Sequence, residues 1–316
     1  MIQENKTIST GARNIILISG KDSLCTAIVQ KTRRPDIDYE YLFNDTYAEL
    51  PEVHEWLDKA SIYLGKPIQC VGRNLEDIIM ETGGLPGYGA AFGRFCTPQA
   101  KIHPLEDHIG IGTKATVYYG LRADEPERVG YKKNDKFNII PMYPLREMGI
   151  TLPLVWRILQ DRDLLPPAFF WQQVYDRVIE RLGSIAKDFI ENLEPWEFRV
   201  LFSWRSRPNC FFCYNQRVYE WVGLLDHHPD LYWKALWIEE NVGKDNDKKQ
   251  RLQMYTWREG ESLRQLIKRA DVVREQRVKA ICKAIVRKAQ GGLFADDDTG
   301  GIDALSLTSC GLYCGK

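Results

Sequence analysis

The sequence predicts an α/β protein in which a five-stranded, mostly parallel twisted sheet carries helices on both faces and is followed by a helical region. Three observations predict this fold. Apolar runs typical of strands alternate with helix-spaced stretches up to residue 149. An apolar run at residues 15–18 leads into the polar turn Ser19-Gly20-Lys21-Asp22-Ser23, which opens a helix. Beyond residue 149, helical spacing continues without strong strands.

The elements of the first half follow in a regular order. Strands are expected where β-branched and aromatic residues cluster, at residues 14–18, 39–43, 67–71, 115–121 and 137–140. Helices are expected between them, at residues 22–31, 51–64, 75–81 and 98–109. Pro51 and Pro98 fall in the first turn of their helices, where proline is tolerated. Alternation of this kind builds a parallel sheet, and in such sheets ligands bind beyond the carboxyl ends of the strands.

The second half is expected to be helical, at residues 152–159, 174–182, 185–193, 217–225, 231–238 and 261–290. We therefore divide the chain into a nucleotide-binding α/β domain (1–149), a helical region that carries Cys210 and Cys213 (150–290), and a tail rich in Gly and Asp that carries Cys310 and Cys314 (291–316).

Composition excludes several classes of protein. Lys plus Arg and Asp plus Glu are both 43, so no global basic field attracts nucleic acid. No apolar run approaches the roughly 20 residues of a membrane helix, and the N-terminus lacks the pattern of a signal peptide. We expect a soluble, cytoplasmic protein without membrane contact. In such a chain, eight cysteines indicate metal ligation, redox chemistry or burial rather than a disulfide framework.

The turn at residues 19–23 is the first candidate site. Its backbone amides and the N-terminus of the following helix favour an anion, so the turn is expected to bind phosphate. Lys21 adds a positive charge, and Asp22 is suited to hold the turn or a Mg²⁺ ion. The alternative is an ordinary strand–turn–helix junction.

Two further segments are expected beside this turn, because parallel strands end at the same edge of a sheet. Asp45 and Thr46 follow the second strand, where Asp45 would serve a metal or the nucleotide, or else cap a helix. Gly120 and Arg122 follow the fourth strand, and Arg128 comes shortly after. Guanidinium groups suit phosphate and sulfate oxygens.

Together with residues 94–105 (Arg-Phe-Cys-Thr-Pro-Gln-Ala-Lys-Ile-His-Pro-Leu), these segments resemble the phosphoadenosine phosphosulfate (PAPS) reductase-like family of N-type ATP pyrophosphatases. The resemblance covers roughly residues 13–146 and rests on the order and spacing of the motifs. It implies that the phosphates of ATP, with Mg²⁺, lie on the nucleotide-binding residues Ser19, Gly20, Lys21, Asp22, Ser23, Asp45, Thr46, Gly120 and Arg122. It further implies catalytic roles for Lys21, Asp22, Arg122 and Arg128. The turn departs from the family's Ser-Gly-Gly-x-Asp-Ser, because Ser19 replaces the first Gly and Ile18 replaces the Ser.

The cysteines indicate sulfur chemistry. Cys210-Phe211-Phe212-Cys213 has the spacing of a metal, cluster or redox pair, although buried packing and zinc are alternatives. Resemblance to iron–sulfur members of the family implies a 4Fe–4S cluster held by Cys96, Cys210 and Cys213, with Cys310 or Cys314 as a candidate fourth ligand. Thr97 stands where those members have a second cysteine.

The remaining cysteines have other predicted roles. Cys310 lies in a Cys-Gly-Leu sequence that partly matches the tail carrying the family's nucleophile, so it is also a candidate nucleophile. Cys25, Cys70 and Cys282 are expected to be structural residues on core faces.

The stretch 261–290 carries nine Lys or Arg side chains and is either a solvated helix face or the local patch that contacts a nucleic acid. The expected function is an adenylating ATP pyrophosphatase in a sulfur-transfer system, similar to the ATP pyrophosphatases of DNA phosphorothioation. Its partners would be a cysteine desulfurase or sulfur carrier and a nucleic acid, with DNA as the first choice. The final sulfur acceptor (DNA, a tRNA base or a small molecule) stays open, and so does the oligomeric state, for which a homodimer is one option. One alternative is a reductase that releases sulfite through Cys310. The other is a non-catalytic accessory protein that binds nucleotide.

Overall fold

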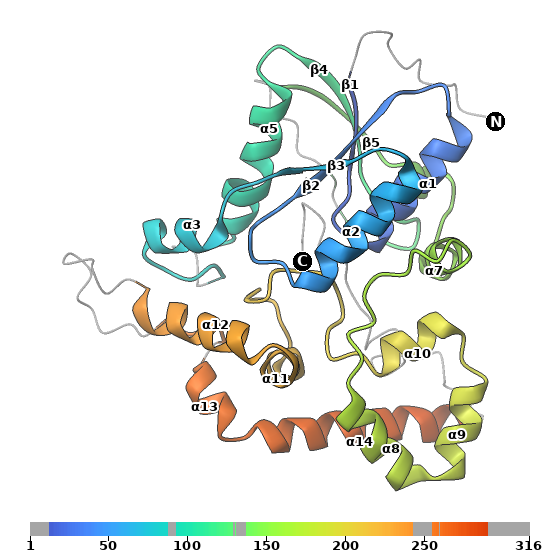
Figure 1. The fold of residues 1–316 in the computed structure, drawn as a ribbon, viewed down its shortest axis with the longest axis vertical. Helices are drawn as coiled ribbons and strands as arrows, with labels where there is room; N and C mark the ends of the chain where they lie inside the picture. Colours follow the sequence, from blue (N-terminus) through green and yellow to red (C-terminus); the bar gives the residue numbers. More distant parts are fainter. Residues whose placement is uncertain are drawn as a thin grey trace.

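A five-stranded sheet forms the centre of the protein (Figure 1). The computed structural model describes residues 13–87, 93–128, 130, 137–242, 255–258 and 260–289. All strand pairs are parallel, and the order is β3-β2-β1-β4-β5. The strands are β1 (Arg13–Leu17), β2 (Tyr39–Asn44), β3 (Ile68–Val71), β4 (Lys114–Tyr118) and β5 (Asn138–Met142). The predicted fold class is confirmed.

The last two strands differ from their expected bounds for physical reasons. β4 ends at Tyr118 instead of residue 121, because the chain turns at Gly120, whose backbone lies close against Asp22 and Ser23 at the start of the first helix (Lys21–Arg33). β5 continues through Pro141 to Met142. A proline is tolerated there because β5 is an edge strand.

Helices cover both faces of the sheet. α1 (Lys21–Arg33), α2 (Pro51–Leu64) and α3 (Leu75–Thr82) lie close to their expected positions. The stretch 98–109 divides into the π-helical turn η1 (Pro98–Ile102) and α5 (His103–Ile109). Buried residues of α1 and α2 belong to one hydrophobic cluster, whereas Leu105 and Ile109 of α5 pack with Leu17 and Leu42 in a second cluster on the other face.

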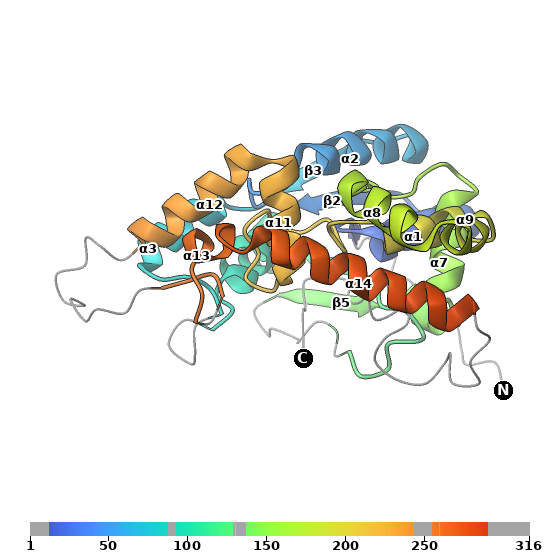
Figure 2. The same ribbon diagram turned by 90° about the horizontal axis from the view of Figure 1, so that it is seen from below.

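The second half is helical as expected. Its helices are α6 (Pro144–Glu147), α7 (Leu152–Gln160), α8 (Gln172–Leu182), α9 (Ser184–Glu191), α10 (Pro195–Leu201), α11 (Val218–His227), α12 (Pro229–Asn241), α13 (Leu263–Ile267) and α14 (Ala270–Ala289). The short helices α6 and α10 were not expected. Helices α8 to α14 gather on one side of the sheet in Figure 1, and α14 packs against α8, α9 and α11 (Figure 2).

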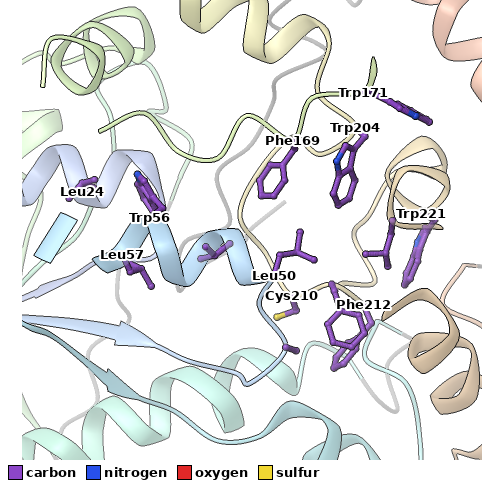
Figure 3. Packing of buried hydrophobic residues seen from close by; sticks show 14 of the residues in the cluster. Leu24, Leu50, Trp56, Leu57, Phe169, Trp171, Trp204, Cys210, Phe212 and Trp221 are labelled. Carbon is purple, nitrogen blue, oxygen red and sulfur yellow. The ribbon is translucent and has the colours of Figure 1, made fainter. Parts of the chain in front are cut away.

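The helical region packs against the loops at the carboxyl ends of the strands. Phe211 N donates to Ala48 O at 2.6 Å, and His228 Nε2 lies 2.9 Å from Glu52 Oε1. Figure 3 shows Leu50 beside Cys210 and Phe212, so the buried core continues from α2 into the helical region. Within the described ranges, no helix has the length and apolar character to span a membrane.

The structure corrects the prediction for one buried cysteine and limits the prediction of a basic surface at residues 261–290. Cys25 and Cys282 are buried as expected, but Cys70 is exposed because β3 is an edge strand. In the stretch 261–290, Arg277 is buried, and the ion-paired basic residues are Arg264, Arg269, Arg274 and Lys279. These pairs reduce the charge that α13 and α14 offer to a nucleic acid.

Candidate functional site

The candidate site lies where the order of the strands reverses. The chain places β2 and β3 on one side of β1 and then β4 and β5 on the other. In open parallel sheets, ligands bind beyond the carboxyl ends of the strands at such a switch point. The turns after β1 and β4 meet there, because a Cβ atom added at Gly120 would lie 2.5 Å from Ser23 N. Only glycine fits this position.

The turn after β1 is closed by the hydroxyl of Ser23. Ser23 Oγ accepts hydrogen bonds from Ser19 N at 2.8 Å and Gly20 N at 3.1 Å, and it donates to Gly20 O at 3.0 Å. α1 begins at Lys21, so its first amides point toward the carboxyl edge of the sheet and favour an anion there. Ile18 is fully buried, and Ser19 makes its turn contact through the backbone. The turn is therefore closed even though Ile18 and Ser19 differ from the family motif.

Asp22 and Arg122 form a buried ion pair in this site. Their side chains are 3% and 5% exposed, and Arg122 Nη1 lies 3.1 Å from both carboxylate oxygens. Arg122 also contacts Asp124 at 2.9 Å and Glu125 at 3.3 Å. Burial lowers the pKa of Arg122, but the nearby carboxylates raise it, and the net result lies above the usual value. Arg122 is therefore a fixed positive charge.

The other predicted cations of this site are also paired. Lys21 Nζ lies 3.4 Å from Asp22 Oδ2, and Arg128 Nη1 lies 2.9 Å from Glu125 Oε2. The group thus contains three cations and three carboxylates (Asp22, Asp124, Glu125). A phosphate at Arg122, or a Mg²⁺ ion at Asp22, would have to exchange with one of these contacts.

The turn after β2 connects the switch point to the cysteines. Asp45 Oδ1 accepts from Tyr47 N at 2.7 Å, so Asp45 holds its own turn and does not cap a helix. Thr46 Oγ1 donates to Glu49 Oε1 at 2.8 Å and lies 3.1 Å from Cys210 Sγ. Glu49 also accepts from Thr46 N at 3.0 Å and Ala48 N at 3.2 Å. No pattern in the sequence singled out Glu49.

The Cys210–Cys213 loop is shaped by the buried guanidinium of Arg205. Arg205 donates to the carbonyl oxygens of Arg207 (3.2 Å), Asn209 (2.6 Å) and Cys210 (2.7 Å), and to Gln216 Oε1 at 2.7 Å. All four acceptors are neutral, and burial lowers the pKa of Arg205. A cation therefore lies directly behind the two cysteines.

The three cysteines predicted as ligands line one cavity. Cys96, Cys210 and Cys213 surround a volume of about 40 Å³ together with Lys101 and Asn209, which is room for a few water molecules. Burial raises the pKa of Cys210 to about 12 and also raises that of Cys96, so both are neutral thiols at pH 7. Burial lowers the pKa of Lys101, but Cys210, Glu49 and the other cysteines, which become negative when they lose a proton, raise it, and the net result lies above the usual value.

Cysteine sulfur atoms that line one cavity are the type of ligand that an iron–sulfur cluster takes. Within the described part of the chain, however, no group of three or more His, Cys, Asp or Glu side chains is placed so that it could hold a metal ion. Cys310 and Cys314, the candidate fourth ligands, lie outside the described residues.

The turn at residues 19–23 and the segment that leads into the cysteine loop lie next to each other. A Cβ atom added at Gly20 would lie 3.9 Å from Pro208 Cγ, in the segment that leads to Cys210. Thr46 supplies a second link through its contact with Cys210. The predicted nucleotide residues and the predicted cysteine ligands therefore form adjacent parts of one edge of the sheet.

No protein-family model matches this chain, and no curated protein matches it. The family resemblance therefore rests on the motifs of the sequence alone.

Proposed function

We propose that this protein is an ATP pyrophosphatase that adenylates an acceptor so that sulfur can replace an acceptor oxygen. The observation that supports this most directly is the close approach between the turn at residues 19–23 and the segment that leads into the cysteine loop, at Gly20 and Pro208. The sequence resemblance to the PAPS reductase-like ATP pyrophosphatases favours the same reaction, and DNA phosphorothioation is the proposed setting.

In the first step, an acceptor oxygen attacks the α-phosphorus of ATP. The new P–O bond forms as the bond to the β-phosphate breaks, and pyrophosphate leaves. The amides at the start of α1 hold the phosphates, and Lys21, Arg122 and Arg128 stabilise the negative charge on departing pyrophosphate. For this, Arg122 exchanges part of its contact with Asp22, which is then available to Mg²⁺.

In the second step, a sulfur nucleophile attacks the activated acceptor atom, and AMP leaves with the former acceptor oxygen. The sulfur originates from a cysteine desulfurase or carrier. Cys96, Cys210 and Cys213 would hold an iron–sulfur cluster, which supplies a binding position for sulfur when present. Lys101 lines the same cavity and supplies positive charge beside the sulfur.

The test is product analysis with the full chain, ATP, Mg²⁺, duplex DNA, a cysteine desulfurase and cysteine. Pyrophosphate and AMP are expected. Ser23→Ala opens the turn and is expected to reduce pyrophosphate release at least ~10-fold, since the hydroxyl holds two amides of the site. The exposed Ser184→Ala is the matched control.

Cysteine variants separate the two steps. Cys213→Ser is expected to abolish sulfur incorporation while pyrophosphate release persists, whereas Cys282→Ser, on the remote helix α14, leaves both unchanged. Sulfite release from adenylyl sulfate without pyrophosphate release from ATP would contradict the proposal and indicate a reductase. Nucleotide binding without any turnover would indicate an accessory protein.

A further inference from the structure

The helical region brings one aromatic side chain to the turn at residues 19–23. α7 packs against α1 (Figure 1), and the ring of Trp156 in α7 lies beside the first residue of α1. Lys21 Nζ is 5.6 Å from the centroid of this ring, which is within the range of a cation–π interaction. Trp156 lies outside residues 13–146, which carry the family resemblance. The contact is therefore a feature of this chain's own helical region.

The Trp156 ring is held firmly and shielded from water. It is 7% exposed and stacks on the ring of Trp196 in α10, with the centroids 5.8 Å apart and 11° between the planes. The buried indole nitrogen of Trp156 has no hydrogen-bond partner within the described residues, so packing rather than a hydrogen bond orients the ring. The side chain of Lys21 is only 14% exposed. Cation–π attraction is strongest where water is excluded in this way.

The two contacts of the Lys21 ammonium group respond differently to a bound nucleotide. One contact is with Asp22, whose Oδ2 lies 3.4 Å from Lys21 Nζ. In the proposed reaction Mg²⁺ competes for that carboxylate. The neutral ring of Trp156 competes with neither Mg²⁺ nor phosphate, so it still holds Lys21 when Asp22 is engaged. A lysine that is already fixed loses less side-chain freedom when it meets a phosphate group.

We propose that Trp156 positions the ammonium group of Lys21 for the pyrophosphate part of the nucleotide. This inference rests on the proposed function, in which Lys21 stabilises departing pyrophosphate. Trp156 is a positioning residue, because it acts through Lys21. The helical region would then help to build the nucleotide site as well as carry Cys210 and Cys213.

The test is a double-variant comparison that measures the affinity of the full chain for inorganic pyrophosphate by calorimetry in EDTA. Trp156→Leu is expected to weaken binding about 10-fold, the size of a desolvated cation–π contact. In the Lys21→Met background the same substitution is expected to change the affinity less than ~2-fold, because the ring has no cation to hold. Trp156→Phe keeps an aromatic face and retains most of the affinity. Trp233→Leu, at an exposed position on α12, is the matched control.

The outcomes separate a positioning role from simple packing. Equal losses of affinity in the wild-type and Lys21→Met backgrounds would mean that Trp156 only supports the packing of α7, and the proposal would be overturned. An unchanged affinity in Trp156→Leu, or a loss in Trp156→Phe as large as that in Trp156→Leu, would overturn it too.

The same measurements are independent of turnover. If the expected pattern is found but ATP yields no pyrophosphate, the proposed function falls and the role of Trp156 stands. If the wild type binds no pyrophosphate, the role of Trp156 falls, and ATP turnover decides the proposed function separately.

Thermal unfolding checks that Trp156→Leu is folded. If it is not, protein produced with fluorinated tryptophan replaces it in the comparison. The fluorinated ring keeps nearly the same size, but its face attracts a cation less strongly. The affinity for pyrophosphate is then expected to fall in the wild type and to stay unchanged in Lys21→Met. The same change in both proteins would overturn the proposal.

Discussion

The two halves of the molecule bury charged side chains in opposite ways. At the switch point, Arg122 is surrounded by Asp22, Asp124 and Glu125. In the helical region, Arg205 donates only to neutral oxygens, and Glu239 accepts from the backbone amides of Trp257 and Leu263.

The consequence appears in the pKa values. Neighbouring charge holds Arg122 in its charged form, whereas burial lowers the pKa of Arg205 and raises that of Glu239 to about 7. Ion pairing therefore maintains the charged form of Arg122 beside the turn at residues 19–23. In the helical region, burial is the largest influence on the pKa of Arg205 and of Glu239, and it opposes their charged forms. A bound ligand or a change in pH can therefore alter the protonation of groups such as Glu239 more readily than that of Arg122.

The largest effect is expected from Arg205→Met. The substitution removes four hydrogen bonds that hold the carbonyl groups of the cysteine loop. At about 1 kcal/mol for each bond, the free energy of unfolding falls by about 4 kcal/mol. Urea unfolding measures this loss, and the half-exposed Arg73→Met is the control. A loss below about 1 kcal/mol would mean that the loop does not depend on the buried guanidinium.

The next effect is a pH dependence that comes from Glu239. Its pKa in the folded state is about 7, against an ordinary value of 4.5. Folding therefore favours the protonated form, and this stabilisation is complete below pH 4.5 and is lost as pH rises through 7. The shift corresponds to about 3 kcal/mol.

Urea unfolding of wild-type protein and Glu239→Gln between pH 4.5 and pH 8 tests this dependence. The wild type is expected to lose about 3 kcal/mol relative to the variant, which stays neutral. A constant difference across this range would show that Glu239 does not titrate as its burial implies, and the contrast between the two halves would weaken.

The smallest effect is expected from Asp22→Asn. The amide keeps the size of the side chain but removes one carboxylate from Arg122, which still contacts Asp124 and Glu125. We expect a loss of about 2 kcal/mol in the free energy of unfolding without nucleotide, the value typical of a hydrogen bond to a charged group. Asp36→Asn, at an exposed position, should leave stability unchanged. If Asp22→Asn lowered the free energy of unfolding more than Arg205→Met does, the expected order of the two effects would be wrong.

Local patterns allowed much of the fold and part of the site to be predicted. The turn after β1 forms through contacts within five residues, such as Ser23 Oγ with Ser19 N, so the sequence of the turn is sufficient to indicate it. Helix starts at Pro51 and Pro98 follow from the fixed backbone angle of proline. Predictions failed where distant packing decides the outcome, as for the end of β4 near Gly120 and for Cys70, which is exposed on edge strand β3.

By itself, the sequence determined the parallel α/β fold, the phosphate-type turn and the cysteines that could act as ligands, because apolar periodicity and turn chemistry are local properties. Only the tertiary structure placed Cys96, Cys210 and Cys213 on one cavity, joined Thr46 to Cys210 and set Lys21 against the ring of Trp156. The physical reason is that burial and pairing depend on which segments meet, and segments as distant as residues 46 and 210 meet only after the chain has folded.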